Sequence, residues 1–210
     1  MAPGPQVTHV APAATVDARR SMILLDAVLD RGNHVCLRVE GGSVAVLPEY
    51  ITTLSEGNAY RFSDWPNPEV PRFGAGVYTI WHRDARFIYV GMSGRGITAA
   101  TPPRNSPHGL YTRLHSHWGG RRSGDQFCVY VADRFVLPTL SQEDVASIAS
   151  GRHEMDALVR RYIHDELLYR YVIVQEGKEA LAIEAAIKSG AWGRGRPFLN
   201  PGRLGSQQGA

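Results

Sequence analysis

The chain has 210 residues, of which 43% are hydrophobic, and it carries a formal net charge of +3 and only two cysteines. This length and apolar content suffice for one substantial domain with additions or for two small ones. No apolar run approaches the roughly 20 residues of a membrane helix, the first residues lack the pattern of a secretory signal, and two cysteines argue against a disulfide framework. We therefore expect a cytoplasmic protein whose two thiols are buried.

The elements expected before residue 72 are, in order, a disordered arm over 1–16, a helix over 17–30, two strands of a hairpin over 34–39 and 43–47, and a short helix or loop over 48–57. Three prolines between Trp65 and Pro71 then indicate a connector. We place a domain boundary there, which makes residues 17–71 an accessory subdomain of unknown role.

The stretch from Gly76 to Gly91 is typical of a β-hairpin. Two runs of β-branched and aromatic residues flank a polar turn over 82–86. Tyr78 and Tyr89 fall near the middle of the two predicted strands. An ordinary core hairpin with buried tyrosine rings would have the same pattern, so this segment alone does not indicate a function.

The elements expected after the hairpin are a loop over 92–107, a helix over 108–120, a strand over 127–132, a short helix opened by a capping box at 141–144, a longer helix over 154–169, a strand over 171–175, a helix over 178–188 and a disordered tail over 202–210. In the first helix, Leu110, Leu114 and Trp118 repeat every four residues and form an inward stripe. Arg113 and His117 form a second stripe with the same spacing, so they point the same way. The neighbouring His115 is expected to be exposed.

These elements predict the α/β (α+β) class. We expect a small mixed, mainly antiparallel sheet with flanking helices over residues 72–201, preceded by the small N-terminal accessory region.

The positive charge is concentrated in the middle of the chain. Residues 72–134 contain nine arginines and three acidic residues, and arginine makes up 21 of the 23 basic residues overall. A biased genome would also favour arginine, so the clustering carries more weight than the residue type. Clustered arginines attract phosphates and bind them in bidentate fashion. We expect nucleic acid to contact Arg83, Arg95, Arg104, Arg121 and Arg122.

Five separated features together resemble the GIY-YIG nuclease superfamily. They are the tripeptides Gly76-Val77-Tyr78 and Tyr89-Val90-Gly91, Arg113 on the following helix, Glu184 in a late helix, and Asn200. The resemblance covers residues 74 to about 201 and depends on the order and type of all five, because either tripeptide alone is a weak signal. Two departures are Met92, where the family often has a lysine, and a longer loop before Arg113, which suggests a sequence-reading or substrate-positioning insertion.

The resemblance implies a role for each feature in hydrolysis of a phosphodiester bond in DNA, with duplex DNA as the expected partner. Glu184 would hold one Mg²⁺ (or Mn²⁺), and Arg113 would stabilise the charge of the transition state. Tyr78 would orient or deprotonate the attacking water and, since a phenol with a pKa near ~10 is a weak base, His117 would take the proton on. Tyr89 would hydrogen-bond the phosphate or water, and Asn200 would fix backbone or substrate.

Each of these residues also has an ordinary structural explanation. Glu184 could be one more helical glutamate, although no basic residue follows at the third position, and Arg113 could form a surface ion pair. His117 could be a solvated residue at a helix end, and Asn200 could form a turn before Pro201. The competing functional hypotheses are a nucleic-acid-binding module without catalytic activity and an interaction protein with an incidental hairpin. Double-strand cleavage would require a homodimer or two successive cuts.

Overall fold

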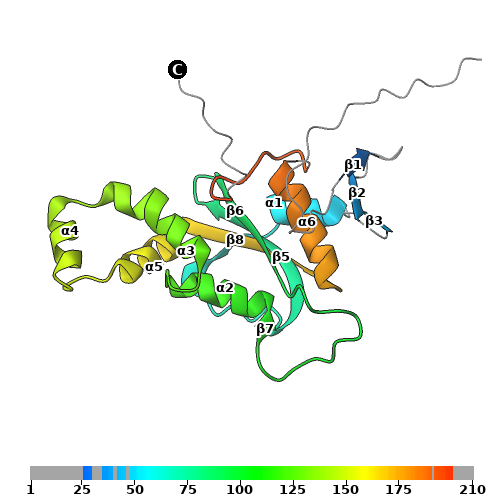
Figure 1. Ribbon diagram of the computed structural model, residues 1–210, viewed down its shortest axis with the longest axis horizontal. Coiled ribbons are helices and arrows are strands. Elements are labelled where there is room, and N and C mark those ends of the chain that lie inside the picture. The colour runs from blue at the N-terminus through cyan, green and yellow to red at the C-terminus, as the bar shows by residue number, and fades with distance from the viewer. Residues whose placement is uncertain (1–25, 30–34, 40–41, 46–47, 191, 201–210) are drawn as a thin grey trace, which may run out of the picture.

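The computed structural model describes residues 26–29, 35–39, 42–45, 48–190 and 192–200 (Figure 1). The strands are β1 (Asp26–Leu29), β2 (Val35–Val39), β3 (Gly42–Ala45), β4 (Tyr60–Arg61), β5 (Phe73–His82), β6 (Phe87–Ser93), β7 (His108–Gly109) and β8 (Leu167–Val174). The α-helices are α1 (Pro48–Glu56), α2 (Leu110–Gly119), α3 (Gln126–Val131), α4 (Gln142–Ala149), α5 (Met155–Glu166) and α6 (Gly177–Ser189). The predicted arm over 1–16 and tail over 202–210 lie outside the described residues.

The main sheet has the strand order β4-β8-β5-β6, and all of these neighbours pair antiparallel. The short β7 joins β5 in parallel, so the sheet is mixed but mainly antiparallel. The hairpin expected from Gly76 to Gly91 is formed by β5 and β6. The prediction of an α+β protein with a small sheet and flanking helices is therefore confirmed.

The helices cover both faces of this sheet, because side chains of the central strand β5 alternate between two cores. Tyr78 and Ile80 belong to a cluster with residues of α2, α3 and α5. Ala75 and Val77 belong to a second cluster with residues of α1 and α6. Figure 1 shows α6 and α1 on one side of the sheet and α2 on the other. Strand β5 is therefore buried on both sides, which fixes the position of Tyr78.

The boundary expected at residue 71 does not separate two packing units. Strand β4 pairs with β8, and Phe62, Trp65 and Val70 are buried in the cluster that contains Tyr78. Leu54 of α1 is buried in the second cluster. Residues from α1 onward therefore complete the main fold, because their apolar side chains supply part of both cores.

The helix predicted over 17–30 is wrong where the structure describes it. Asp26–Leu29 is strand β1, which pairs antiparallel with β2, and β2 pairs with β3 in a separate three-stranded sheet. The hairpin predicted from the following residues is present as β2 and β3. Pairing with β2 gives the backbone of residues 26–29 hydrogen-bond partners that a helix would otherwise have supplied.

Two predictions in the second half of the chain are also wrong. The strand expected over 127–132 is helix α3, in which Phe127, Cys128 and Val131 are buried at helical spacing. The helix expected over 154–169 ends at Glu166, where the chain enters strand β8. The capping box at Ser141 and Asp144 is present at the start of α4, and α6 ends at Gly190 in the left-handed conformation.

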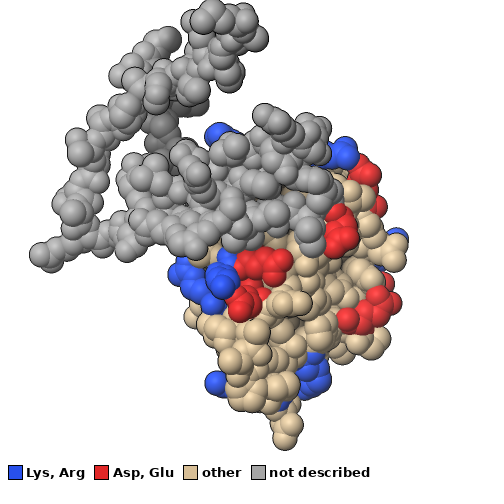
Figure 2. All heavy atoms as spheres, turned by 90° about the vertical axis from the view of Figure 1, so that its right-hand side faces the viewer, with Lys and Arg blue, Asp and Glu red and all other residues tan. Residues whose placement is uncertain are grey.

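Within the described ranges, no helix is long and apolar enough to span a membrane. Figure 2 shows one face of the molecule, on which the described basic and acidic side chains are interspersed rather than gathered into one basic field.

Candidate active site

A pocket beside the edge strand β6 collects most of the predicted site residues. Helices α2 and α6, which pack on opposite faces of the sheet, both contribute to its wall. The pocket is lined by Tyr78, Tyr89, Gly91, Met92, Arg95, Arg113, His117, Asp125, Gln126, Phe127, Leu181 and Glu184. Five of the six residues predicted to be catalytic are in this list, and Asn200 is not.

Three buried side chains of the pocket form a continuous chain of hydrogen bonds. The Tyr78 hydroxyl lies 2.7 Å from Nε2 of His117, and Nδ1 of His117 lies 2.7 Å from Oδ2 of Asp125. Asp125 Oδ2 also accepts from the Ser116 hydroxyl at 2.7 Å, and Asp125 Oδ1 accepts from the Phe127 backbone N–H at 3.1 Å. Tyr78 and His117 are each only 1% exposed.

The protonation states follow from these contacts. Burial opposes ionisation of Asp125, but hydrogen bonds from His117, Ser116 and the Phe127 N–H hold its pKa below the ordinary value. The ionised carboxylate only accepts hydrogen bonds, so Nδ1 of His117 carries the proton. Burial lowers the pKa of His117, so the ring is neutral at pH 7 and its Nε2 accepts from Tyr78. Burial also raises the pKa of Tyr78 well above its usual value.

A steric constraint explains why the last residue of the second tripeptide, Gly91, is a glycine. Tyr78 on β5 lies opposite Gly91 on β6, and a Cβ at Gly91 would overlap the Tyr78 hydroxyl. Gly76 is constrained similarly, because its Cβ would press on the Val172 carbonyl oxygen of β8. Gly91 therefore makes room for the Tyr78 ring, whereas Gly76 allows β5 to lie close to β8.

Tyr89 and Arg113 lie at the more open side of the pocket. The Tyr89 ring is 6.3 Å from the Tyr78 ring, and burial together with the charge of Glu184 raises the pKa of Tyr89 to about 12. Arg113 is exposed on α2, one turn before His117, and no ion pair to it is found among the described residues. Its guanidinium is therefore available to an anion.

Glu184 lines the pocket, as predicted for a metal ligand, and it also pairs with a lysine of its own helix, as an ordinary helical glutamate would. Its side chain is 13% exposed and reaches the pocket from α6, yet Oε1 also lies 3.0 Å from Nζ of Lys188 one turn later. The expectation that Glu184 has no basic partner on its helix is thus wrong, because the partner stands at the fourth position rather than the third. Its carboxylate supplies oxygen donors beside open space, which suits a hard cation that keeps several waters.

Asn200 fixes backbone, which is one of the two roles expected for it. Its Oδ1 accepts from the Val90 N–H at 2.7 Å and its Nδ2 donates to the Val90 carbonyl at 2.8 Å. The preceding Phe198 and Leu199 donate their N–H groups to carbonyls of β6. Asn200 therefore acts on the pocket indirectly, by holding the strand that carries Tyr89 and Gly91.

The five arginines expected to bind nucleic acid fall into two groups. Arg95 lines the pocket, and Arg104 and Arg121 are exposed without a carboxylate partner among the described residues. Arg83 pairs with Glu166 and Arg122 pairs with Asp156, both at 2.7 Å. These last two are already partly neutralised, because each carboxylate competes with a phosphate for the guanidinium.

Asp125 is the site residue that the sequence prediction missed. It is 3% exposed and caps the start of α3 by accepting from Phe127. An acidic residue directly before a helix is a capping signal, but the apolar run that follows Asp125 was assigned to a strand. The helical spacing of buried residues continues through Val131, Phe135 and Val136, which would have revealed it.

Across the described residues, one cluster of three possible metal ligands is found, formed by His117, Asp125 and Cys128. A thiol and an imidazole suit zinc better than magnesium. Burial raises the pKa of the Cys128 thiol, and His117 and Asp125 already bind each other. These groups are therefore internally satisfied, and Glu184 remains the better candidate for Mg²⁺.

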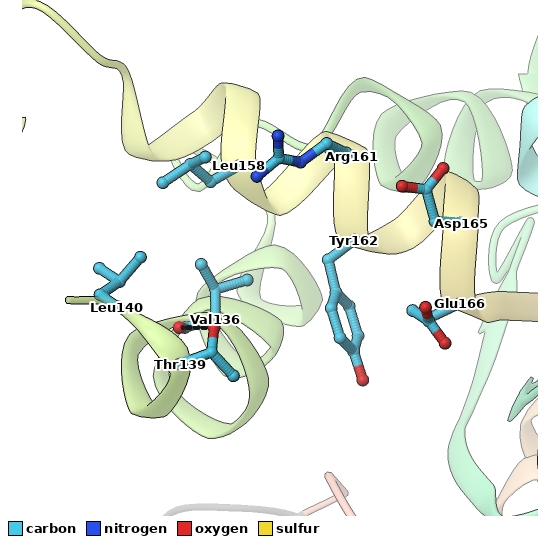
Figure 3. Close-up of a pocket in the computed structure, with 8 residues that line it drawn as sticks. All are labelled: Val136, Thr139, Leu140, Leu158, Arg161, Tyr162, Asp165 and Glu166. Atoms are coloured by element: carbon cyan, nitrogen blue, oxygen red, sulfur yellow. Dashed lines mark hydrogen bonds between the residues drawn. The ribbon is translucent and has the colours of Figure 1, made fainter. Parts of the chain in front are cut away.

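A separate pocket lies away from these residues, between α5 and the turns before α4. Figure 3 shows Leu158, Arg161 and Tyr162 of α5 above Val136 and Leu140. Its lining contains none of the predicted site residues.

Comparison with protein-family models, with curated proteins and with solved structures yields no significant match to this chain. The pocket beside β6 is therefore the feature of this chain from which a function can be inferred.

Proposed function

We propose that this chain is a metal-dependent endonuclease of the GIY-YIG type that hydrolyses phosphodiester bonds in DNA. The observation that carries the proposal is the convergence of Tyr78, His117, Arg113 and Glu184, from three separate elements, in one pocket. A proton acceptor, a cation and a carboxylate are what hydrolysis of a phosphodiester requires.

The proton path in this proposal begins at the attacking water. Tyr78 accepts a proton from the water as its own proton passes to Nε2 of His117, 2.7 Å away. Asp125 stabilises the resulting imidazolium through its bond to Nδ1. The high pKa of Tyr78 rules out a resting tyrosinate at pH 7, so the two transfers accompany the attack on phosphorus.

Arg113 donates hydrogen bonds to the equatorial phosphate oxygens, where negative charge develops. Glu184 would hold the divalent cation, which supplies charge stabilisation at the phosphate and at the leaving 3′ oxygen. Lys188 pairs with Oε1 of Glu184, so its positive charge would compete with a cation for this carboxylate.

Conversion of supercoiled plasmid tests the proposal. We expect purified protein to cut with Mg²⁺, to stop with EDTA, and to lose at least about a hundredfold in rate in Glu184→Gln. Glu179→Gln, on the same helix but outside the pocket, is the matched control and should cut normally.

A binding module without catalytic activity is the alternative. If this alternative is correct, the protein does not cut DNA. Its affinity for DNA then falls with salt and is the same in wild type and in Glu184→Gln. Cutting that persists in EDTA would exclude the metal-dependent mechanism.

A further inference from the structure

The outer side of α2 carries a row of aromatic rings that the proposed chemistry does not use. Tyr111, His115 and Trp118 lie on one stripe of α2, and His164 of α5 continues the row. Successive ring centroids are 6.4, 5.1 and 5.8 Å apart, and the interplanar angles are 12°, 26° and 18°. His115 is exposed, and the other three rings are half-buried. Trp118, which was expected to face inward, packs against the main core and also lines the groove described below. Each ring lies against its neighbours in the row, and Nδ1 of His115 accepts from Nε1 of Trp65 at 3.0 Å, so the row is a fixed aromatic border that a nucleobase can contact.

A groove beside these rings is lined by arginines and hydroxyl groups. Its walls are His115, Ser116 and Trp118 of α2, Arg121 and Ser123 of the following turn, and Arg160 of α5. No carboxylate lines it, whereas the two pockets described above each include carboxylates. The groove therefore has the charge that attracts an anion.

The arginines of the groove are free to bind that anion. Arg160 uses Nε to donate to the Gly119 carbonyl at 2.9 Å, which orients its guanidinium while its two terminal nitrogens form no bond within the described chain. Arg121 has no carboxylate partner among the described residues. A Cβ at Gly120 would overlap the Arg160 backbone, so the end of α2 lies in direct contact with α5.

We infer that this groove binds single-stranded nucleic acid, with bases against the His115 and Trp118 rings and phosphates on Arg121 and Arg160. An unpaired strand is favoured over a duplex, because the base faces in a duplex are covered by their neighbours and cannot reach side-chain rings. The inference goes beyond the proposed function, since this binding does not require cleavage.

The groove is linked to the candidate active site through one contact. Ser116 lines the groove, and its hydroxyl donates to Asp125, which lines the pocket beside β6. The two sites thus lie on either side of the end of α2. This placement of the substrate rests on the proposed function: if the pocket cleaves, a strand held in the groove lies next to the cleavage site, and the substrate class is a nucleic acid with an unpaired segment.

Fluorescence anisotropy of labelled oligonucleotides in EDTA tests the inference without cleavage. The probes are a dT 12-mer, a rU 12-mer and a blunt duplex of equal length. We expect the wild type to prefer the single strands, and His115→Ala and Arg121→Ala each to weaken their binding by about fivefold or more while changing duplex binding less than twofold. The two single strands distinguish DNA from RNA.

Controls and a second readout exclude a structural explanation. His153→Ala and Arg152→Ala change exposed residues of the same types at the α4–α5 turn and should bind as wild type. Arg121→Ala should also flatten the dependence of log affinity on log salt by about 0.7, as expected for one lost phosphate contact. Trp118→Leu tests the second ring of the groove. Circular dichroism checks the fold of this variant and of His115→Ala, which leaves the Nε1–H of the buried Trp65 without its acceptor.

The outcome separates this inference from the nuclease proposal. Single-strand binding that is unchanged in both His115→Ala and Arg121→Ala, or a wild type that prefers the duplex, would overturn the groove even if plasmid is cut. Groove binding that depends on these residues, without any cutting, would retain the groove and overturn only the nuclease.

Discussion

The candidate site has an inner half, formed by Tyr78, His117 and Asp125, and an outer half, formed by Arg113 and Glu184. The two halves differ in how their side chains are held. Tyr78, His117 and Asp125 are at most 3% exposed, and each is held by hydrogen bonds within the chain. Arg113 is exposed, and Glu184 pairs with a lysine whose side chain is 41% exposed. The comparison indicates that the interior fixes a proton path in advance, whereas the outer charges are kept for a charged ligand.

The largest effect is expected from a substitution of Tyr78, which stands at the end of the hydrogen-bonded chain nearest the attacking water. Tyr78→Phe removes the proton acceptor and leaves Nε2 of the buried His117 without a donor. We expect cleavage to slow by about 10²–10⁴-fold and the free energy of unfolding to fall by about 1–3 kcal/mol, measured by single-turnover plasmid cleavage and urea unfolding. Tyr171→Phe, on the adjacent strand opposite Tyr78, is the control and should change neither greatly.

The next effect separates the two tasks of Asp125. Asparagine can still cap α3 but cannot stabilise a protonated His117 as a carboxylate does, so Asp125→Asn should slow cleavage about a hundredfold. It should also lower the melting temperature, because the charged acceptor for His117 and Ser116 is lost. Asp125→Ala should lose the same activity and a further ~1 kcal/mol of stability from the missing cap. Normal cleavage by Asp125→Asn would show that the carboxylate serves only the fold.

The pH dependence of stability tests the burial of the inner half. The folded state lowers the pKa of His117 from 6.5 and that of Asp125 from 3.8, so the unfolded chain binds more protons in acid. Stability from these groups is fully present above pH 6.5, falls below 6.5 through His117, and falls further below 3.8 through Asp125.

We therefore expect the melting temperature to drop between pH 6.5 and pH 5, and the drop to be shallower in His117→Gln. His153→Gln changes an exposed histidine and should retain the wild-type slope. Equal slopes in wild type and His117→Gln would mean that His117 is not buried as a neutral ring.

The smallest effect concerns the outer half. Lys188→Ala removes the side chain that competes with a cation for Glu184, and helix pairs at this spacing contribute only about 0.3–0.5 kcal/mol. We expect the Mg²⁺ concentration for half-maximal cleavage to fall about twofold. Lys178→Ala breaks a more exposed pair with Glu176 at the other end of α6. This control should leave the Mg²⁺ concentration for half-maximal cleavage unchanged. If Lys188→Ala instead needs more Mg²⁺ for half-maximal cleavage, Lys188 contacts the substrate rather than competing with the cation.

Local patterns predicted the parts of the site that lie on strongly periodic elements. Alternation located the hairpin with Tyr78 and Tyr89, and helical spacing placed Arg113 and His117 on one side of α2. These predictions succeed because both residues of each pair lie within one element or one hairpin.

Contacts between distant segments were not predictable in this way. Asp125 was missed because a short apolar run fits a strand or a buried helix equally well, and only burial over two further turns distinguishes them. The prolines after Trp65 suggested a boundary, yet Trp65 and Val70 are buried in the main core. By contrast, the pairing of Lys188 with Glu184 could have been predicted, because side chains four residues apart are neighbours on one face of a helix.

The segment that carries Asn200 also has a consequence for self-association. Strand β6 is an edge of the main sheet, and residues 198–200 cover its outer side with backbone and side-chain hydrogen bonds. An uncovered edge strand is a template for pairing with another chain. A chain cut before Phe198 would therefore expose β6 to a second copy, and a loss of monodispersity on gel filtration would precede any loss of the fold.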